Sequence, residues 1–317
     1  MKSPIVSVIV PIYNVSKYIE RCVRSLMEQT CPDIEYIFVD DATPDDSMAV
    51  LERVLEDYPQ RRANVRILHN MQNQGLAKSR FAGMDVAEGE YVLHCDSDDW
   101  VEQNMIQTML EAALAHDADM VCCEAVKEMP SGKVSYKYDY DEETRENGLL
   151  ALSLREIHVV VWNKLIRRAL FLEHDIRNFE GINLGEDSAL TVRLRYFSRK
   201  TVIVHQPLYH YNRMNQDSMM ARINENGIQQ QIHLARHIEE FFMSVGEEKR
   251  YRRVINFYKF ASKQLYLRDA HDLKKWRSVY PESHADIFHY RGLTLKGKIK
   301  WWVCAYFPKW ILSPFIK

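Results

Sequence analysis

The chain has 317 residues, of which 46% are apolar, and a formal net charge of −2 at pH 7. A chain of this length and apolar content can bury a core of its own, which excludes a disordered protein. The small net charge gives no global attraction to nucleic acid or to an acidic polymer, so any electrostatic specificity must be local.

The first 125 residues alternate between short apolar runs and segments with helical spacing. Residues 5–10, Ile-Val-Ser-Val-Ile-Val, predict a buried parallel strand that is closed by Pro11. Further strands are expected at 36–39, 65–68, 91–95 and 120–123, with helices between them. Strands that alternate with helices predict an α/β fold with a doubly wound, mostly parallel sheet, which binds ligands beyond the carboxyl ends of its strands.

The fourth expected strand leads into an acidic loop, Asp96-Ser97-Asp98-Asp99. Carboxylates this close repel one another unless a cation or several hydrogen-bond donors neutralise them. Their oxygen ligands suit Mg2+ or Mn2+ that carries a phosphate-bearing substrate. The alternative is an ordinary acidic turn that caps the next helix, and Asp99 is expected to cap a helix that begins near Trp100.

The second half of the chain has a less regular pattern. The segment 128–140 is polar and rich in tyrosine, and a helix is expected at 167–174. The turn Gly185-Glu186-Asp187 opens another helix, and strands are expected at 201–205 and 208–211. From about Asn224 onward the sequence is predicted to be helical.

The six cysteines show no Cys-x-x-Cys spacing, and we expect reduced, mostly buried thiols in a cytoplasmic protein. The N-terminus leads directly into a strand, without a charged and then apolar leader, and no apolar run reaches the length needed to span a bilayer.

Five segments together resemble the family 2 glycosyltransferases, which have the GT-A fold and transfer a sugar from a nucleotide donor. They are Val-Ser-Val-Ile-Val-Pro-Ile-Tyr-Asn (6–14), Ile-Phe-Val-Asp-Asp-Ala-Thr-Pro-Asp (37–45), Asn-Gln-Gly-Leu-Ala-Lys-Ser-Arg (73–80), Gly-Glu-Tyr-Val-Leu-His-Cys-Asp-Ser-Asp-Asp (89–99) and Gly-Glu-Asp (185–187). The resemblance spans roughly residues 4–215. It implies a nucleotide-sugar-binding half at 1–125, an acceptor-binding and catalytic half at 126–222 and a helical C-terminal region at 223–317.

Nucleotide binding is expected at the carboxyl ends of the first strands. Tyr13 offers an aromatic ring for the nucleobase, with Pro11 and Asn14 beside it. The resemblance favours Asp41, and less strongly Asp40, as the acceptor of an imide N–H from uracil or thymine. These residues also have structural alternatives: Tyr13 could be a packed turn tyrosine, and Asp41 could cap the following helix.

Two cations, Lys78 and Arg80, stand near a helix start that favours anions, and the resemblance favours Arg80. A solvated helix face is the alternative for Lys78. In the acidic loop, the resemblance assigns Asp98 to the divalent metal, Mn2+ or Mg2+, and Asp96 to the ribose and the metal. Ser97 lies between them.

The resemblance implies that Asp187 is the catalytic base and that Glu186 orients it or contacts the acceptor. A capping pair at a helix start is the alternative. Trp162 could form a platform for a sugar ring or simply pack in the core. Further candidates for contacting the diphosphate or the acceptor are His210, Arg213 and Ser218, although Asn212 interrupts the family's usual Tyr-Arg pair here.

The C-terminal residues 291–317 contain six basic residues and no acidic one. They are interleaved with the aromatic residues Trp301, Trp302, Phe307, Trp310 and Phe315. This composition suits the headgroup region of an anionic membrane, so we expect peripheral attachment to the inner face of the cytoplasmic membrane. A helix packed on the protein with its lysines in water is the alternative.

The expected activity is therefore the inverting, metal-assisted transfer of a sugar, with a UDP-sugar as the expected donor. The acceptor would be a hydroxyl of a saccharide or lipid-linked molecule in the synthesis of bacterial surface polysaccharide or lipopolysaccharide. One alternative is a catalytically inactive carbohydrate-binding or scaffold subunit at the membrane. Another is a nucleotidyltransferase, which would normally show a Gly-rich phosphate loop where this chain has Pro11-Ile12-Tyr13-Asn14.

Overall fold

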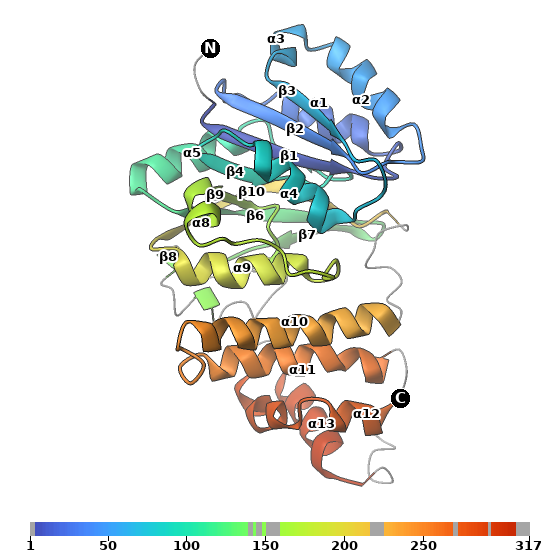
Figure 1. Ribbon diagram of the computed structural model, residues 1–317, viewed down its shortest axis with the longest axis vertical. Coiled ribbons are helices and arrows are strands. Elements are labelled where there is room, and N and C mark those ends of the chain that lie inside the picture. Colours follow the sequence, from blue (N-terminus) through green and yellow to red (C-terminus); the bar gives the residue numbers. More distant parts are fainter. Residues whose placement is uncertain are drawn as a thin grey trace. The chain divides into compact units, whose positions relative to one another are not determined.

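The computed structural model describes residues 4–138, 142–143, 148–149, 159–215, 225–268, 272–290 and 293–308. The chain forms two compact units (Figure 1). The first comprises residues 1–146, 160–178 and 193–218, and the second comprises residues 147–159, 179–192 and 219–317. The sequence divides the chain into three parts by their expected roles in donor binding, acceptor binding and membrane contact. That division stays a prediction.

The first unit is an α/β structure. Its elements are β1 (Val6–Ile12), α1 (Ile19–Met27), β2 (Ile34–Asp40), α2 (Ser47–Glu56), α3 (Pro59–Arg62), β3 (Val65–His69), α4 (Leu76–Val86), β4 (Tyr91–His94), β5 (Trp100–Val101), α5 (Met105–His116), β6 (Met120–Met129), β7 (Gly132–Tyr136), β8 (Glu142–Glu143), β9 (Lys164–Arg167), α8 (Arg168–Glu173) and β10 (Thr201–Asn212). Helix α9 (Glu186–Phe197) begins in the second unit and ends in the first.

The described strands form one sheet in the order β3-β2-β1-β4-β9-β6-β10-β5, with β7 on β6 and β8 on β10. The pairs β3-β2, β2-β1, β1-β4 and β6-β10 are parallel. Strand β9 is antiparallel to both of its neighbours, β4 and β6. The mostly parallel sheet is therefore confirmed, with one antiparallel strand inserted between the fourth and fifth predicted strands.

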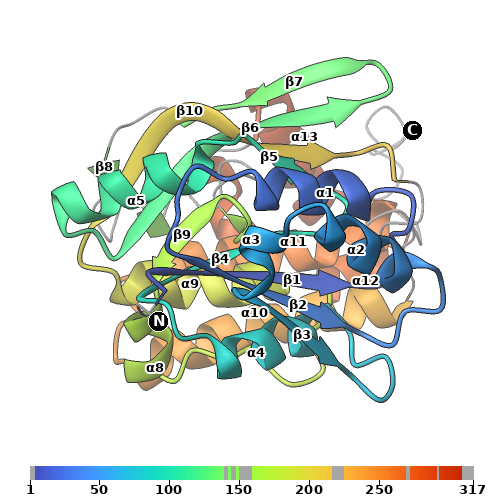
Figure 2. The ribbon, with the colours of Figure 1, turned by 90° about the horizontal axis from the view of Figure 1, so that it is seen from above.

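Helices cover both faces of the sheet, which explains why its central strands are apolar without alternation. Seen from above, α1 and α2 lie on one side of β1 and β2, and α4 lies on the other (Figure 2). Every residue of β1 is buried. Such strands end together at one sheet edge, where the polar loops after β1, β2 and β4 emerge.

Two local expectations about the ends of elements were wrong, and the strands expected at 201–205 and 208–211 form one strand, β10, with shifts of register between Val204 and Tyr209. The first strand does not end at Pro11 but continues to Ile12, and Pro11 lies in register with Val39 of β2. Strand β4 pairs with β1 only as far as Ile9. Pro11 lies beyond this pairing, so its missing N–H removes no hydrogen bond between β1 and β4. Asp99 does not cap a helix, because the next helix, α5, begins at Met105.

The second unit is helical after residue 225. Its elements are α10 (Glu225–Ser244), α11 (Arg252–Arg268), α12 (Leu273–Ser278), the 3-10 helix η2 (Pro281–His289) and α13 (Leu295–Tyr306). Trp276, Phe260, Ile287 and Cys304 belong to its apolar core. The predicted helical C-terminal region is confirmed. Within the described ranges, no helix is both long and apolar enough to cross a membrane.

All six cysteines are buried and none forms a disulfide, as the sequence predicted. Cys22 of α1 and Cys95, which follows β4, bring their sulfur atoms to 3.9 Å. Both belong to the apolar core of the first unit.

Candidate active site

The acidic loop, residues 96–99, follows β4 at the carboxyl edge of the sheet. Asp96 accepts a 2.6 Å hydrogen bond from Arg80, whose side chain is 1% exposed. The side chain of Asp96 itself is 25% exposed, so one face of this carboxylate is open to solvent. Arg80 lies on α4, and the ion pair therefore joins two motifs that the sequence placed at the nucleotide site.

Asp98 has an unusual protonation equilibrium. Burial, together with the nearby charge of Asp96, raises the pKa of its carboxyl to about 6. Its Oδ2 accepts a 2.8 Å hydrogen bond from Nδ2 of Asn215. A carboxylate that loses hydration without gaining a cation favours its protonated form, and a divalent cation would reverse this preference.

Asp99 is fully buried and connects the acidic loop to β10. Its two oxygens accept hydrogen bonds from the Tyr209 hydroxyl at 2.7 Å and the Asn212 backbone N–H at 2.7 Å. The same hydroxyl accepts a 3.1 Å bond from the N–H of Asp96. Burial and the neighbouring carboxylates raise the pKa of Asp99. This residue therefore fixes the loop from within.

His94 is the last residue of β4 and lies near the charged group of Arg80. It is 1% exposed, and burial and the charge of Arg80 lower its pKa to about 3, so the ring is neutral. Neither ring nitrogen has a hydrogen-bond partner among the described residues. The ring packs edge-on against Phe171 at 6.4 Å. It therefore forms part of the apolar support behind the acidic loop.

Asp41 follows β2 and holds the loop that leads into α4. Its Oδ1 accepts bonds from Nδ2 of Asn70 at 2.8 Å and from the N–H of Gln74 at 2.7 Å. Its Oδ2 accepts from the N–H of Gly75 at 2.9 Å. Asp41 is 3% exposed, so it shapes the 70–75 loop, whereas Asp40 bonds to the exposed His69 at 3.0 Å.

The residues after β1 differ in exposure. The Tyr13 ring is 46% exposed, as a stacking surface requires. Asn14 has a left-handed backbone, with φ 55°, and its N–H bonds to Oγ1 of Thr43 at 2.8 Å. On α4, Lys78 is exposed while Arg80 is buried, a geometry that favours the solvated alternative for Lys78. Ser97 is buried in the acidic loop.

The expected base stands in the second unit, in the Gly-Glu-Asp loop, residues 183–187. Glu186 and Asp187 occupy the first turn of α9, where the helix dipole favours carboxylates. Oε1 of Gln230 on α10 accepts bonds from the N–H groups of Asn183 and Leu184, both at 2.9 Å. The backbone of this loop is thus attached to α10.

Gly185 closes the same loop against α10. Its φ of +86° lies in the left-handed region, and an added Cβ would meet Nε2 of Gln231 at 2.6 Å. That same Nε2 donates a 2.7 Å hydrogen bond to the carbonyl of Leu184. The positive φ favours glycine here, and a larger residue would also push the Gln231 amide away from the carbonyl of Leu184.

The remaining candidate residues that the structure describes contact other side chains of the same chain. Trp162 is 2% exposed and stacks on Tyr209 at 4.3 Å, which favours the core-packing alternative. The ring nitrogens of His210 bond to Glu128 at 3.0 Å and Glu102 at 2.8 Å. Arg213 donates to the Tyr211 hydroxyl at 3.0 Å. Ser218, Trp310 and Phe315 lie outside the described residues.

The donor set of the acidic loop fits a divalent cation. No group of three or more His, Cys, Asp or Glu side chains in the described part of the chain forms a ready-made metal cage. Mg2+ and similar ions, however, are usually held by one or two carboxylates and complete their shell with water and substrate phosphates. Asp98 and Asp96 are such a pair.

Several residues of the site were missed by sequence reasoning. Asn70, Tyr209, Asn212 and Asn215 hold Asp41 or the acidic loop, and Gln230 holds the Gly-Glu-Asp loop. The sequence predicted a strand at 208–211, but nothing local in the sequence shows that Tyr209 faces Asp99, 110 residues away.

The chain is similar to known proteins over much of its length. The family model described as "Glycosyl transferase family 2" matches residues 7–174. Glycosyltransferase GlyG of Streptococcus pneumoniae is 30% identical over 233 residues, which are 70% of this chain and 75% of GlyG.

Two solved structures share the fold at low sequence identity. S. aureus TarS 1-349 in complex with UDP-GlcNAc is 19% identical with a TM-score of 0.65, covering 94% of this chain and 86% of that one. The mannosyltransferase PcManGT from Pyrobaculum calidifontis, in complex with GDP-Man and Mn2+, is 16% identical with a TM-score of 0.53 and covers 91% and 75%.

Proposed function

The chain belongs to glycosyl transferase family 2 and is a glycosyltransferase, and we propose that it transfers a hexosyl or N-acetylhexosaminyl group from a UDP-sugar. The acceptor is a hydroxyl of a saccharide or of a lipid-linked molecule, and the product belongs to bacterial surface polysaccharide or lipopolysaccharide. The acidic loop carries this proposal, because Asp98 is a half-buried carboxylate with a raised pKa beside a second, partly exposed carboxylate.

The donor half of the site is the carboxyl edge of the first unit. Asp98 and Asp96 would hold Mn2+ or Mg2+, which neutralises the charge of the departing diphosphate when bound. Arg80 keeps Asp96 in place through the 2.6 Å ion pair. The exposed Tyr13 ring stacks on the base, and Asp41 shapes the loop at 70–75 that borders the nucleotide. TarS in complex with UDP-GlcNAc supports a uridine donor.

The acceptor half depends on Asp187. In this proposal, its carboxylate accepts the proton of the acceptor hydroxyl while that oxygen attacks the anomeric carbon from the face opposite the leaving diphosphate. The reaction is a single displacement with inversion. Glu186, the preceding residue, orients the acceptor, and the bonds from Gln230 and Gln231 to the loop keep both residues in position.

The protein would act at a membrane surface as a peripheral protein, because lipid-linked acceptors are presented there. The basic and aromatic residues of the C-terminal helix support this placement.

A donor screen tests the proposal. The purified chain is incubated with uridine, thymidine and guanosine sugar donors, with Mn2+, Mg2+ or a chelator, and the release of nucleoside diphosphate is measured. We expect turnover of a uridine donor that stops with the chelator and falls ~10²- to 10⁴-fold in Asp187→Asn, because a general base is lost. Failure of every uridine and thymidine donor with both metals would overturn the proposal. Donor binding without turnover would instead support the inactive carbohydrate-binding alternative.

A further inference from the structure

Helix α13 exposes a continuous row of large apolar side chains. Leu295, Ile299, Trp302 and Tyr306 are 69%, 41%, 38% and 56% exposed, respectively. Their spacing of four, three and four residues places them on one face of the helix. Val303 and Cys304 are buried on the other face, so the exposed row is not the side that packs on the core.

Trp301 belongs to the packed side. It stacks on Trp276 with ring centres 5.9 Å apart and meets Phe260 edge-on at 6.1 Å. The sequence had grouped Trp301 with Trp302 as membrane-facing aromatics. The structure separates them, because one anchors the helix to its unit and the other is directed to the surface.

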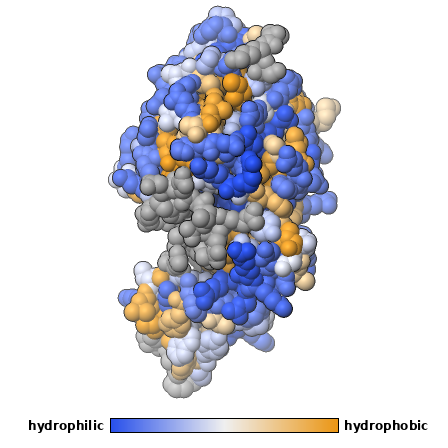
Figure 3. Space-filling view, turned by 90° about the vertical axis from the view of Figure 1, so that its left-hand side faces the viewer, coloured by the Kyte–Doolittle hydropathy of each residue, from blue (hydrophilic) through white to orange (hydrophobic). Residues whose placement is uncertain are grey.

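The exposed row extends onto η2. Phe288 is 46% exposed, and its ring centre lies 6.4 Å from that of Trp302. Trp302 also contacts Phe307 at 5.1 Å and Tyr306 at 6.1 Å. We call these residues the apolar stripe: Phe288, Leu295, Ile299, Trp302 and Tyr306. The space-filling view shows hydrophobic areas on the surface of the second unit, beside strongly hydrophilic ones (Figure 3).

Cations border the stripe. Lys296, Lys298 and Lys300 lie on α13, and residues 293–308 contain no acidic residue. Nζ of Lys298 donates a 2.9 Å hydrogen bond to the carbonyl of Phe288, which places this charge directly beside the stripe. Nζ of Lys300 lies 5.3 Å from the centre of the Trp301 ring, on the packed side of the helix, so Lys296 and Lys298 are the lysines that border the stripe.

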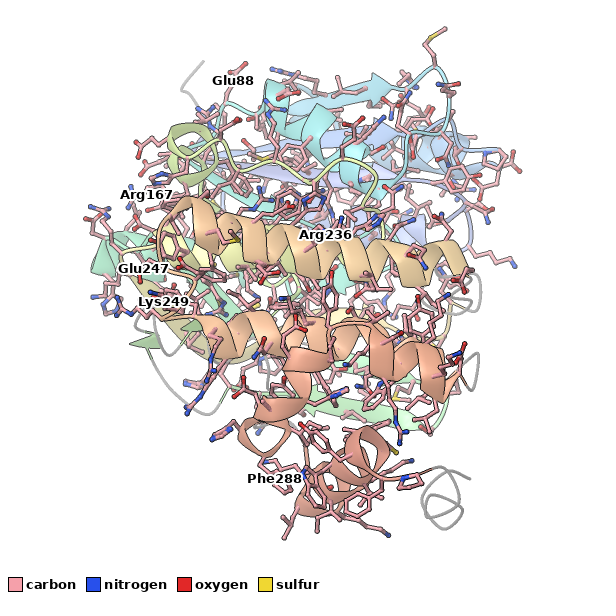
Figure 4. All side chains as sticks on the ribbon, turned by 60° about the horizontal axis from the view of Figure 1, so that its bottom comes forward. Glu88, Arg167, Arg236, Glu247, Lys249 and Phe288 are labelled. Atoms are coloured by element: carbon pink, nitrogen blue, oxygen red, sulfur yellow. The ribbon has the colours of Figure 1, made fainter. Side chains whose placement is uncertain are left out.

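A second basic group stands at the turn between α10 and α11. It consists of the exposed residues Lys249, Arg250, Arg252 and Arg253. Arg252 lies 3.9 Å from Asp286 of η2, the 3-10 helix that carries Phe288. Figure 4 labels Lys249 of the basic group and Phe288 of η2. The basic character near the stripe therefore extends beyond the C-terminal segment.

Charge decides between the possible occupants. A second copy of the chain, docked stripe to stripe, would bring Lys296 and Lys298 against their own copies. An anionic bilayer surface instead accepts aromatic rings at the headgroup level and offers a negative potential to the lysines. We propose that the apolar stripe lies in the headgroup layer of a membrane that contains anionic lipid, with Lys296 and Lys298 at the phosphates.

The apolar stripe gives a structural basis for the membrane association proposed above. The proposal does not depend on the sugar-transfer reaction, so its test requires no enzymatic activity. The full-length chain is sedimented with vesicles of phosphatidylcholine alone or with phosphatidylglycerol added. We expect binding only to the anionic vesicles. The double variant Ile299→Ser/Trp302→Ser should bind at least roughly tenfold more weakly, and Lys296→Gln and Lys298→Gln should each weaken binding about fivefold.

A matched control removes an exposed leucine elsewhere. Leu172→Ser on α8 changes a side chain that is 61% exposed in the first unit, and we expect it to leave vesicle binding unchanged. Circular dichroism checks the fold of each variant. The proposal is overturned if wild type ignores anionic vesicles or if the stripe variants bind them as wild type does. It is also overturned if the double variant loses only self-association in sedimentation velocity, because the occupant would then be a second copy.

Discussion

The acidic loop of the first unit and the Gly-Glu-Asp loop of the second both present carboxylates, but they are held in different ways. In the acidic loop, the donors bind the carboxylates themselves: Arg80 binds Asp96, and Asn215 binds Asp98. In the Gly-Glu-Asp loop, the amides of Gln230 and Gln231 bind backbone groups of Asn183 and Leu184.

The difference indicates what each loop controls. Burial and the charge of Asp96 raise the pKa of Asp98, and the hydrogen bond from Asn215 opposes this by stabilising the charged carboxylate. The hydrogen bonds to the backbone of Asn183 and Leu184 fix the course of the loop that leads to Glu186 and Asp187. We therefore expect the acidic loop to respond to changes of charge and the Gly-Glu-Asp loop to respond to changes of position.

The largest expected effect follows from Asp98→Asn. Removing a metal-binding carboxylate should lower metal-dependent transfer by at least ~100-fold, because a metal contributes several kcal/mol to stabilising the transition state. Initial rates over a series of Mn2+ concentrations measure this. Without metal, the free energy of unfolding at pH 7 should not fall, since the amide avoids the burial of a charge. Glu111→Gln, which changes an exposed side chain on α5, is the control. Normal transfer rates in Asp98→Asn would show that Asp98 does not bind the metal.

Tyr209→Phe tests the attachment of the acidic loop to β10. The variant leaves Asp99 and the N–H of Asp96 without the hydroxyl that bonds to both. We expect the free energy of unfolding to fall by about 1–3 kcal/mol, measured by urea denaturation. Tyr211→Phe in the same strand is the control, because its hydroxyl accepts an exposed bond from Arg213 and its loss should cost less. Equal losses in the two variants would contradict the role given to Tyr209.

Gln230→Leu tests whether the Gly-Glu-Asp loop holds Asp187 in position. The two N–H groups of Asn183 and Leu184 lose their acceptor, and a small shift of Asp187 should lower kcat on the order of tenfold while the donor KM stays unchanged. Gln230→Glu keeps an acceptor oxygen and should restore most of the rate. Gln229→Leu, one residue away, removes bonds to Glu225 and Tyr266 and is the matched control. A rise in donor KM with unchanged kcat would show that the loop does not position the base.

The sequence predicted the parts of the fold that depend on local patterns. The apolar runs before Asp40 and Asp96 are buried strands, and parallel strands of this kind end at one edge. The two wrong expectations, at Pro11 and Asp99, concern the ends of elements, where a partner strand decides the outcome. The insertion of β9 between β4 and β6 depends on pairing between distant segments. The bonds from Tyr209 and Gln230 are likewise long-range, and no periodicity in the chain encodes them.

The smallest expected effect is the pH dependence of metal binding in the acidic loop. The pKa of Asp98 without metal is about 6, above the ordinary value of 3.8, because burial penalises its charge. Protons therefore compete with Mn2+ as the pH falls through about 6, and the apparent Kd should rise by up to about tenfold per pH unit below that value. Calorimetric titrations between pH 5 and 8 measure it. An exposed pair of carboxylates would keep its affinity for Mn2+ down to about pH 4. A Kd for Mn2+ that stays constant above about pH 5 would therefore show that burial does not set the charge of the acidic loop. The contrast between this loop and the Gly-Glu-Asp loop would then be lost.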